Sequence, residues 1–220
     1  MARMARIVVP DYPHHVVQRG NRRQRTFFSP ADYRAYIRFI AKAKSDAEVK
    51  IWAYCLMPNH VHLIAVPGQV DSLAVLFRDA HRRYTRRINS REDWRGHLWQ
   101  ERFHSFVMDE KHLLAAVRYV EMNPVRAGLC TSPNRWPWSS VHAHFRRQDD
   151  AIVSVAPMLE RVSNWENYLL RAESEVRLRA FRKHTKTGRP VGDDTFIAKL
   201  ESLTGRKLRK KKPGRKAGIK

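Results

Sequence analysis

The segment VKIWAYCLMPNHVHLIAVPG, residues 49–68, decides the fold of this 220-residue chain. Residues 49–57 are rich in β-branched and aromatic side chains, and residues 61–66 form a second apolar run, so we predict two strands. Pro58 and Asn59 between them favour a turn. The two strands are close enough in the sequence to pair as an antiparallel hairpin.

The predicted hairpin has a helix on either side of it in the sequence. Ser29 and Pro30 are typical of an N-cap followed by proline in the first turn, and the helix is predicted to run to about residue 45. After the hairpin, residues 72–89 carry apolar side chains at helical spacing. Two more strands are predicted at 7–19 and 105–108.

The resulting order, β-α-β-β-α-β, indicates an α+β chain with a ferredoxin-like fold, in which two helices cover one face of an antiparallel sheet. An added helix is predicted over 110–122, ending before Pro124 because a residue that precedes proline disfavours the helical conformation. We expect a catalytic domain at 1–145, a helical extension at 146–205 and a disordered basic tail at 206–220. Within the extension, helices are predicted at 164–183 and 194–203.

The chain is strongly basic. Lys and Arg number 43 against 21 Asp and Glu, which gives a formal net charge of +22. Nine of these cations lie in residues 206–220, where such a block repels itself. Subtracting those nine leaves +13 on the rest of the chain, so we expect a basic folded surface and a polyanionic partner, most commonly nucleic acid. The alternative is a basic protein that merely lies near acidic partners.

The sequence also indicates where the protein is found. Its two cysteines, Cys55 and Cys130, are far apart and form no C-x-x-C pair, which favours a reducing compartment. No apolar run approaches the ~20 residues of a membrane span, and the start of the chain does not resemble a signal peptide. We therefore expect a cytoplasmic, nucleoid-associated protein, monomeric or homodimeric, with no membrane partner.

The first candidate site is Asn59-His60-Val61-His62, at the start of the second hairpin strand. Strand side chains alternate between faces, so His60 and His62 project to the same side. This geometry suits two imidazoles that converge on one metal ion. The alternative is that both histidines are exposed or satisfied by local hydrogen bonds. Zinc is the chemical rival, although clustered cysteines are lacking.

The second candidate site lies on the predicted helix 110–122 and just after it. Tyr119 and Asn123 are four residues apart and share a helix face. Ala115 and Ala116, one turn earlier, would leave that face low enough to admit a phosphate. The alternative is a tyrosine at the rim with its hydroxyl in water. Tyr84, by contrast, falls in an apolar stripe and is predicted to lie in the core.

These segments together resemble a known family. Residues 54–64, YCLMPNHVHLI, resemble the His-hydrophobic-His motif of the single-tyrosine (HUH) transposases of the IS200/IS605 type. Residues 119–128, YVEMNPVRAG, look like the branch called REP-associated tyrosine transposases, and segments 14–21 and 138–140 are similar to that branch as well. The resemblance covers about residues 6–145.

The resemblance implies binding, cleavage and joining of single-stranded DNA hairpins, on repetitive palindromic elements, through a 5′-phosphotyrosine intermediate. It implies that Tyr119 is the nucleophile and that His60 and His62 bind Mg²⁺ or Mn²⁺. Asn123 would be a further metal ligand, where the insertion-sequence enzymes usually have glutamine. Two alternatives stay open: a DNA-binding protein that organises or regulates repeats without cutting, and a metal-dependent phosphodiesterase that uses water instead of Tyr119.

Arginine-rich segments are predicted to contact the DNA phosphates. They are the basic turn after the first strand and the polar face of the 72–89 helix. The predicted contacts are Arg19, Asn21, Arg22, Arg23, Arg25, Arg78, Arg82, Arg83, Arg86 and Arg87. Trp94 and Trp99 are predicted either to stack on unpaired bases or to be buried.

Overall fold

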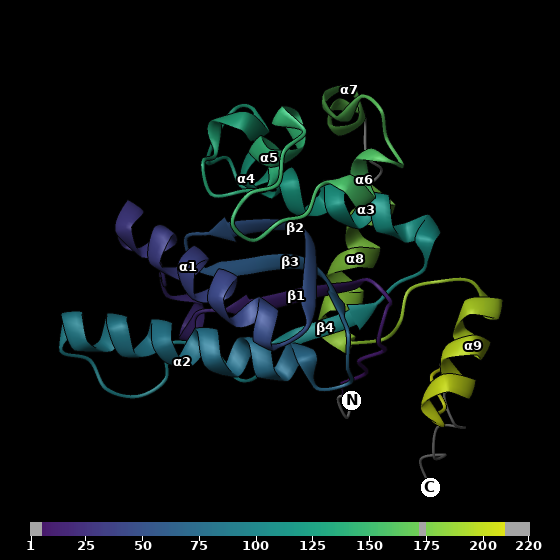
Figure 1. Ribbon diagram of the computed structural model, residues 1–220, viewed down its shortest axis with the longest axis horizontal. Helices are drawn as coiled ribbons and strands as arrows, with labels where there is room; N and C mark the ends of the chain where they lie inside the picture. Colours follow the sequence, from purple (N-terminus) through teal and green to yellow (C-terminus); the bar gives the residue numbers. More distant parts are fainter. Residues whose placement is uncertain (1–5, 172–174, 210–220) are drawn as a thin grey trace, which may run out of the picture.

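The computed structural model describes residues 6–171 and 175–209, and its centre is a four-stranded antiparallel sheet. The strand order is β2-β3-β1-β4, and each neighbouring pair is antiparallel. The predicted ferredoxin-like arrangement is confirmed (Figure 1). The strands are β1 (His14–Arg19), β2 (Val49–Met57), β3 (His60–Pro67) and β4 (His104–Val107).

Helices cover both faces of the sheet (Figure 1). Two long helices, α1 (Pro30–Asp46) and α2 (Ser72–Glu92), pack on one face, where they meet Val61, Leu63 and Ala65 of β3. The opposite face carries α3 (Glu110–Glu121) and α8 (Glu175–Thr187). The shorter helices are α4 (Asn123–Arg126), α5 (Val141–Arg146), α6 (Ala156–Leu159), α7 (Trp165–Leu170) and α9 (Asp194–Thr204), with the 3-10 turns Asn21–Arg23 and Pro133–Arg135.

The starts of both long helices agree with the sequence. Ser29 and Asp32 form a reciprocal capping box at the start of α1, with Pro30 in the first turn, and Asp71 precedes α2. Tyr84 is fully buried, as predicted for the core, and its hydroxyl donates to the carbonyl oxygen of Thr26 at 2.6 Å. Burial of a tyrosine with its hydroxyl satisfied stabilises the contact between α2 and the segment that precedes α1.

Two predictions about the C-terminal part are corrected. A single helix over 164–183 is wrong, because α7 ends at Leu170 and Arg171 has an extended backbone, with ψ of 139°. The predicted tail begins too early: Leu208 is 3% exposed and its amide donates to the carboxylate of Glu201. Residues 210–220 of that tail lie outside the described residues. In the described parts of the chain, the helices are too short or too polar to cross a membrane.

Stability is expected to fall on acidification, and His14 should contribute. His14 is fully buried, with Nδ1 2.7 Å from the carbonyl oxygen of Tyr12 and Nε2 accepting from the amide of Val9. Burial lowers the pKa of His14 to about 4, whereas an unfolded histidine titrates near 6.5. Between these values the unfolded chain binds more protons, so acid favours unfolding.

From pH 7 to pH 5, His14 should remove at most ~2 kcal/mol from the free energy of unfolding, measured by urea titration. The control variant His14→Gln should show a shallower pH dependence than the wild type. Equal slopes for the two proteins would contradict this assignment.

Candidate active site

A cleft of about 510 Å³ opens on the sheet face that carries α3 and α8. It brings together the four residues that the sequence selected for metal binding and catalysis. They come from β3, α3 and α4, and basic side chains from β1 and the turn after it border them. The four selected residues are His60, His62, Tyr119 and Asn123, and the bordering basic residues are Arg19 and Arg23.

The two strand histidines lie side by side in the cleft, with ring centroids 4.9 Å apart. Nδ1 of His60 is 2.6 Å from Oδ1 of Asn59, and Nδ1 of His62 is 2.9 Å from Nε2 of His15. Nε2 of each ring makes no hydrogen bond within the described residues. In each histidine, Nδ1 is thus occupied by a local hydrogen bond, and Nε2 remains available to another partner.

Both histidines are neutral at neutral pH. Burial, assisted by the nearby Arg19 guanidinium, lowers the pKa of His60 to about 3. Burial also holds the pKa of His62 well below its ordinary value, assisted by the positive charges of Arg126 and Arg19. A neutral imidazole has a lone pair that can bind a metal ion.

The donor set fits a divalent cation. Each histidine is oriented from behind by a second polar side chain, which is the usual arrangement around metal-binding histidines. Within the part of the chain that the structure describes, no three His, Cys, Asp or Glu side chains cluster as a metal site. A third protein ligand would therefore be an amide, and Asn123 lines the same cleft, with a buried Nδ2 that has no partner among the described residues.

Tyr119 lines the cleft and is only 8% exposed, so it lies deeper than the open rim position that the alternative assumed. Its ring is edge-on to His62 and His15, with centroids 5.9 and 5.8 Å away. Phe181 of α8 packs against it at 5.6 Å. The guanidinium carbon of Arg126 is 4.2 Å from the ring centroid, and the same side chain donates to the Tyr119 carbonyl oxygen.

One wall of the cleft was not predicted from the sequence. Ala116 is packed in the core and Ala115 lines a separate cleft. The prediction that these two alanines leave space beside Tyr119 is therefore wrong. Instead, α8 contributes one wall through Arg182, Thr185 and Lys186. The sequence beyond residue 150 carried no recognised pattern that would have placed this helix against the tyrosine.

The residues predicted to contact DNA lie in different parts of the structure. Arg19 and Arg23 line the cleft, whereas Asn21 lines another one and Arg22 and Arg25 are exposed nearby. The arginines of α2 lie on the other helical layer, and several of them pair with acids: Asp79 is 3.3 Å from Arg82 and 2.8 Å from Arg83, and Asp32 is 4.0 Å from Arg87. The remaining predicted contacts on this helix are Arg78 and Arg86.

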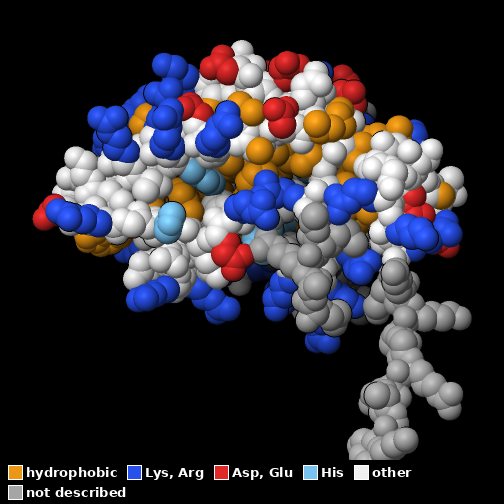
Figure 2. All heavy atoms as spheres, turned by 90° about the horizontal axis from the view of Figure 1, so that it is seen from below, with side chains coloured by type: hydrophobic (Ala, Val, Ile, Leu, Met, Phe, Trp, Pro, Cys, Tyr) orange, Lys and Arg blue, Asp and Glu red, His pale blue; other side chains and the backbone are white. Residues whose placement is uncertain are grey.

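The surface and the two tryptophans add to this pattern. Lys and Arg side chains are spread over the face shown in Figure 2, whereas acidic side chains gather mainly along its upper margin. Trp99 is buried and stacks on His81 at 4.4 Å, which removes it as a base-stacking platform. Trp94 is 44% exposed.

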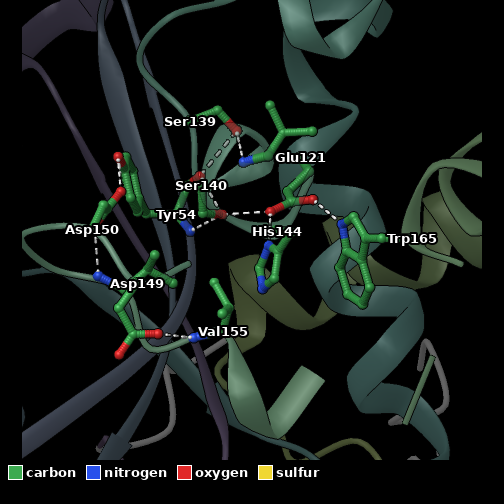
Figure 3. A network of polar contacts seen from close by, with 11 residues as sticks. Tyr54, Glu121, Ser139, Ser140, His144, Asp149, Asp150, Val155 and Trp165 are labelled. Atoms are coloured by element: carbon green, nitrogen blue, oxygen red, sulfur yellow. Dashed lines mark hydrogen bonds and ion pairs between the residues drawn. The ribbon is translucent and has the colours of Figure 1, made fainter. Parts of the chain in front are cut away.

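A buried polar network holds the helix that carries Tyr119 (Figure 3). Glu121, at the end of α3, is fully buried, and its carboxylate accepts hydrogen bonds from three side chains. These come from Ser140 at 2.5 Å, from His144 at 2.7 Å and from Trp165 at 2.8 Å. Ser140 also accepts from the amide of Tyr54 on β2 at 2.9 Å. The carboxylate thus connects α3 to β2, α5 and α7, a role for which the sequence offered no signal.

The ferredoxin-like sheet and its basic cleft, with paired histidines and a tyrosine, define the class of DNA-processing enzymes built on this fold. Residues 8–123, more than half of the chain, match the family described as "Transposase IS200 like", and the protein belongs to this family.

Two proteins and one solved structure similar to this chain are consistent with this family. The REP-associated tyrosine transposase of Escherichia coli (strain K12) is 25% identical over 127 residues, covering 57% of this chain and 74% of that protein. A putative REP-associated tyrosine transposase of Haemophilus influenzae is 30% identical over 101 residues, 41% of this chain and 57% of that protein. A solved REP-associated tyrosine transposase bound to a REP hairpin shares the fold, with a TM-score of 0.58 and 23% identity over 70% of this chain and 92% of that one.

Removal of the Glu121 carboxylate should be strongly destabilising. Glu121→Ala leaves the buried donors of His144 and Trp165 without an acceptor, whereas the Ser140 hydroxyl can still donate to the Tyr54 carbonyl oxygen. Loss of one partner of a buried polar pair typically removes about 3–5 kcal/mol. Urea unfolding at pH 7 measures the loss. The exposed Glu166→Ala, on α7, should change the free energy of unfolding by less than ~0.5 kcal/mol. A similar small change for Glu121→Ala would show that the network does not hold α3.

Proposed function

We propose that this IS200-like protein binds single-stranded DNA hairpins and cuts and rejoins them through a covalent bond to Tyr119, with Mg²⁺ or Mn²⁺ as cofactor. The observation that carries the proposal is the meeting of His60, His62 and Tyr119 in one basic cleft. Hairpin DNA is favoured as the substrate because a relative of the same fold binds a REP hairpin.

The residues of the cleft have distinct parts in the proposed reaction. His60 and His62, with Asn123 as an auxiliary ligand, would hold the cation through Nε2 and the amide oxygen. The bound cation supplies charge that polarises the scissile phosphate and stabilises the leaving oxygen. Tyr119 loses its phenolic proton to solvent, and its Oη attacks phosphorus. The Oη–P bond forms, the P–O3′ bond breaks, and the 3′ oxygen leaves and takes up a proton.

The product of this step is a 5′-phosphotyrosine on α3 and a free 3′-hydroxyl. The reverse reaction, with a 3′-hydroxyl from either strand end, joins DNA without a nucleotide cofactor. Arg126 lies over the Tyr119 ring and lines the cleft, so its guanidinium can stabilise charge that develops on the phosphate. Arg19, Arg23, Arg182 and Lys186 border the same space and would bind neighbouring phosphates.

A complete set of reacting groups lies within one chain. Tyr119 packs against His62 of the same molecule, and α8 covers it from the same molecule. This supports action by a monomer, in which the tyrosine serves the histidines of its own chain. The α2 arginines, on the other helical layer, would then contact only a DNA segment that wraps beyond the cleft.

Tyr119→Phe should abolish the covalent adduct. The variant removes only the attacking oxygen, so folding and hairpin affinity should stay close to those of the wild type. Incubation with a labelled single-stranded hairpin and Mn²⁺, followed by denaturing electrophoresis, measures the adduct. Tyr168→Phe, on α7, is the matched control and should form the adduct normally. An adduct formed by Tyr119→Phe would exclude this nucleophile, and hairpin binding without any wild-type adduct would favour the non-cleaving alternative.

His60→Ala and His62→Ala should each reduce adduct formation by at least ~100-fold, because one imidazole alone holds a divalent ion poorly. Excess chelator should do the same to the wild type, and added Mn²⁺ should restore activity. His97→Ala, an exposed histidine outside this cleft, should leave the rate unchanged. Full wild-type activity in chelator would rule out the metal mechanism.

A further inference from the structure

His15 on β1 lies beside the proposed metal site but has no part in the reaction above. In the strand register, His15 is opposite Ile64, so His62 is its diagonal neighbour on the same sheet face. Nε2 of His15 is 2.9 Å from Nδ1 of His62. The two ring planes are parallel to within 5° and their centroids are 5.1 Å apart, so the hydrogen bond lies edge to edge in the plane of both rings. Such a bond restrains the rotation of the His62 ring as well as its position.

We infer that His15 is a positioning residue, whose Nε2 accepts the Nδ1 hydrogen of His62 and so leaves the Nε2 lone pair of His62 for a cation in the cleft. The inference rests on the proposed function. Each neutral imidazole carries one hydrogen, so only two arrangements of the pair are possible. If His15 donated instead, His62 would carry its hydrogen on Nε2 and would be unable to bind a cation there.

The surroundings of His15 argue against a role in packing alone. The side chain is 1% exposed, and its ring is held edge-on by Phe106 at 5.1 Å and by Tyr119 at 5.8 Å. Its Nδ1 is buried and has no hydrogen-bond partner within residues 6–171 and 175–209. A buried polar atom without a partner destabilises the fold, a cost that an apolar side chain at this position would avoid.

The neighbouring His14 shows what a purely structural histidine looks like in this fold. Both of its nitrogens have backbone partners, the carbonyl oxygen of Tyr12 and the amide of Val9. Among the described residues, His15 has one hydrogen-bond partner, and that partner is a proposed metal ligand. Asn59 stands in the same relation to His60, with Oδ1 2.6 Å from Nδ1. Each proposed ligand is thus backed by one acceptor, and the acceptor of His62 comes from a different strand.

The test uses the full chain, with Mn²⁺ as the probe and no DNA. His15→Phe removes the acceptor but keeps a planar ring beside Phe106, and it should weaken Mn²⁺ binding by 10- to 100-fold in calorimetry. His15→Gln offers an amide oxygen in place of Nε2 and should recover most of the affinity. His81→Phe, a histidine-to-phenylalanine change on α2, is the matched control and should bind Mn²⁺ as the wild type does.

The tautomer of His62 gives a second readout that needs neither metal nor activity. Nitrogen-15 spectra of the wild type should show the hydrogen of His62 on Nδ1, and His15→Phe should shift it toward Nε2. Wild-type His62 with its hydrogen on Nε2, or unchanged Mn²⁺ affinity in His15→Phe, would overturn the inference, and the proposed function would still stand as long as the wild type binds Mn²⁺ more tightly than His62→Ala. Failure of the proposed function is seen separately, as equal Mn²⁺ binding by the wild type and His62→Ala.

Discussion

The antiparallel pairing of β1 with β3 is the constraint on which both the core and the cleft depend. It aligns Val17 with His62 and Arg19 with His60, so the residues of the cleft come from two strands held in one register. The same alternation sends Val61 and Leu63 to the helices on the opposite face. A slip of one residue would exchange these two sets. The hydrophobic packing of α1 and α2 therefore also determines where the histidines point.

The tyrosine depends on a second constraint, which is electrostatic. The proposed metal ligands and the proposed nucleophile lie on different elements: the histidines are on the sheet, and Tyr119 is on α3. The buried carboxylate of Glu121 holds α3 to β2 through Ser140 and to the C-terminal helices through His144 and Trp165. Since a buried carboxylate is stable only with its donors in place, the position of α3 is determined by several segments together.

The sequence was sufficient for features that arise from local patterns. The hairpin, the capped starts of α1 and α2, and the shared face of His60 and His62 all follow from residues close together in the chain. Features that need distant partners were missed. Residues 164–183 have no proline or glycine, so nothing in them predicts a break, and the break at Arg171 was not found. Likewise, no local pattern pairs His15 with His62, Glu121 with Trp165, or Phe181 with Tyr119.

The contact between Phe181 and Tyr119 has a consequence for the newly made chain. Everything on the sheet side of the cleft, from β1 to α4, is synthesised by residue 126, whereas the aromatic cover of the tyrosine comes 62 residues after Tyr119 itself. At roughly 5–20 residues per second, that interval lasts several seconds on the ribosome. Once Trp165 has been made, α3 can be held in place before Phe181 covers the tyrosine, so the nascent protein passes through a state with an uncovered cleft before the mature site is complete.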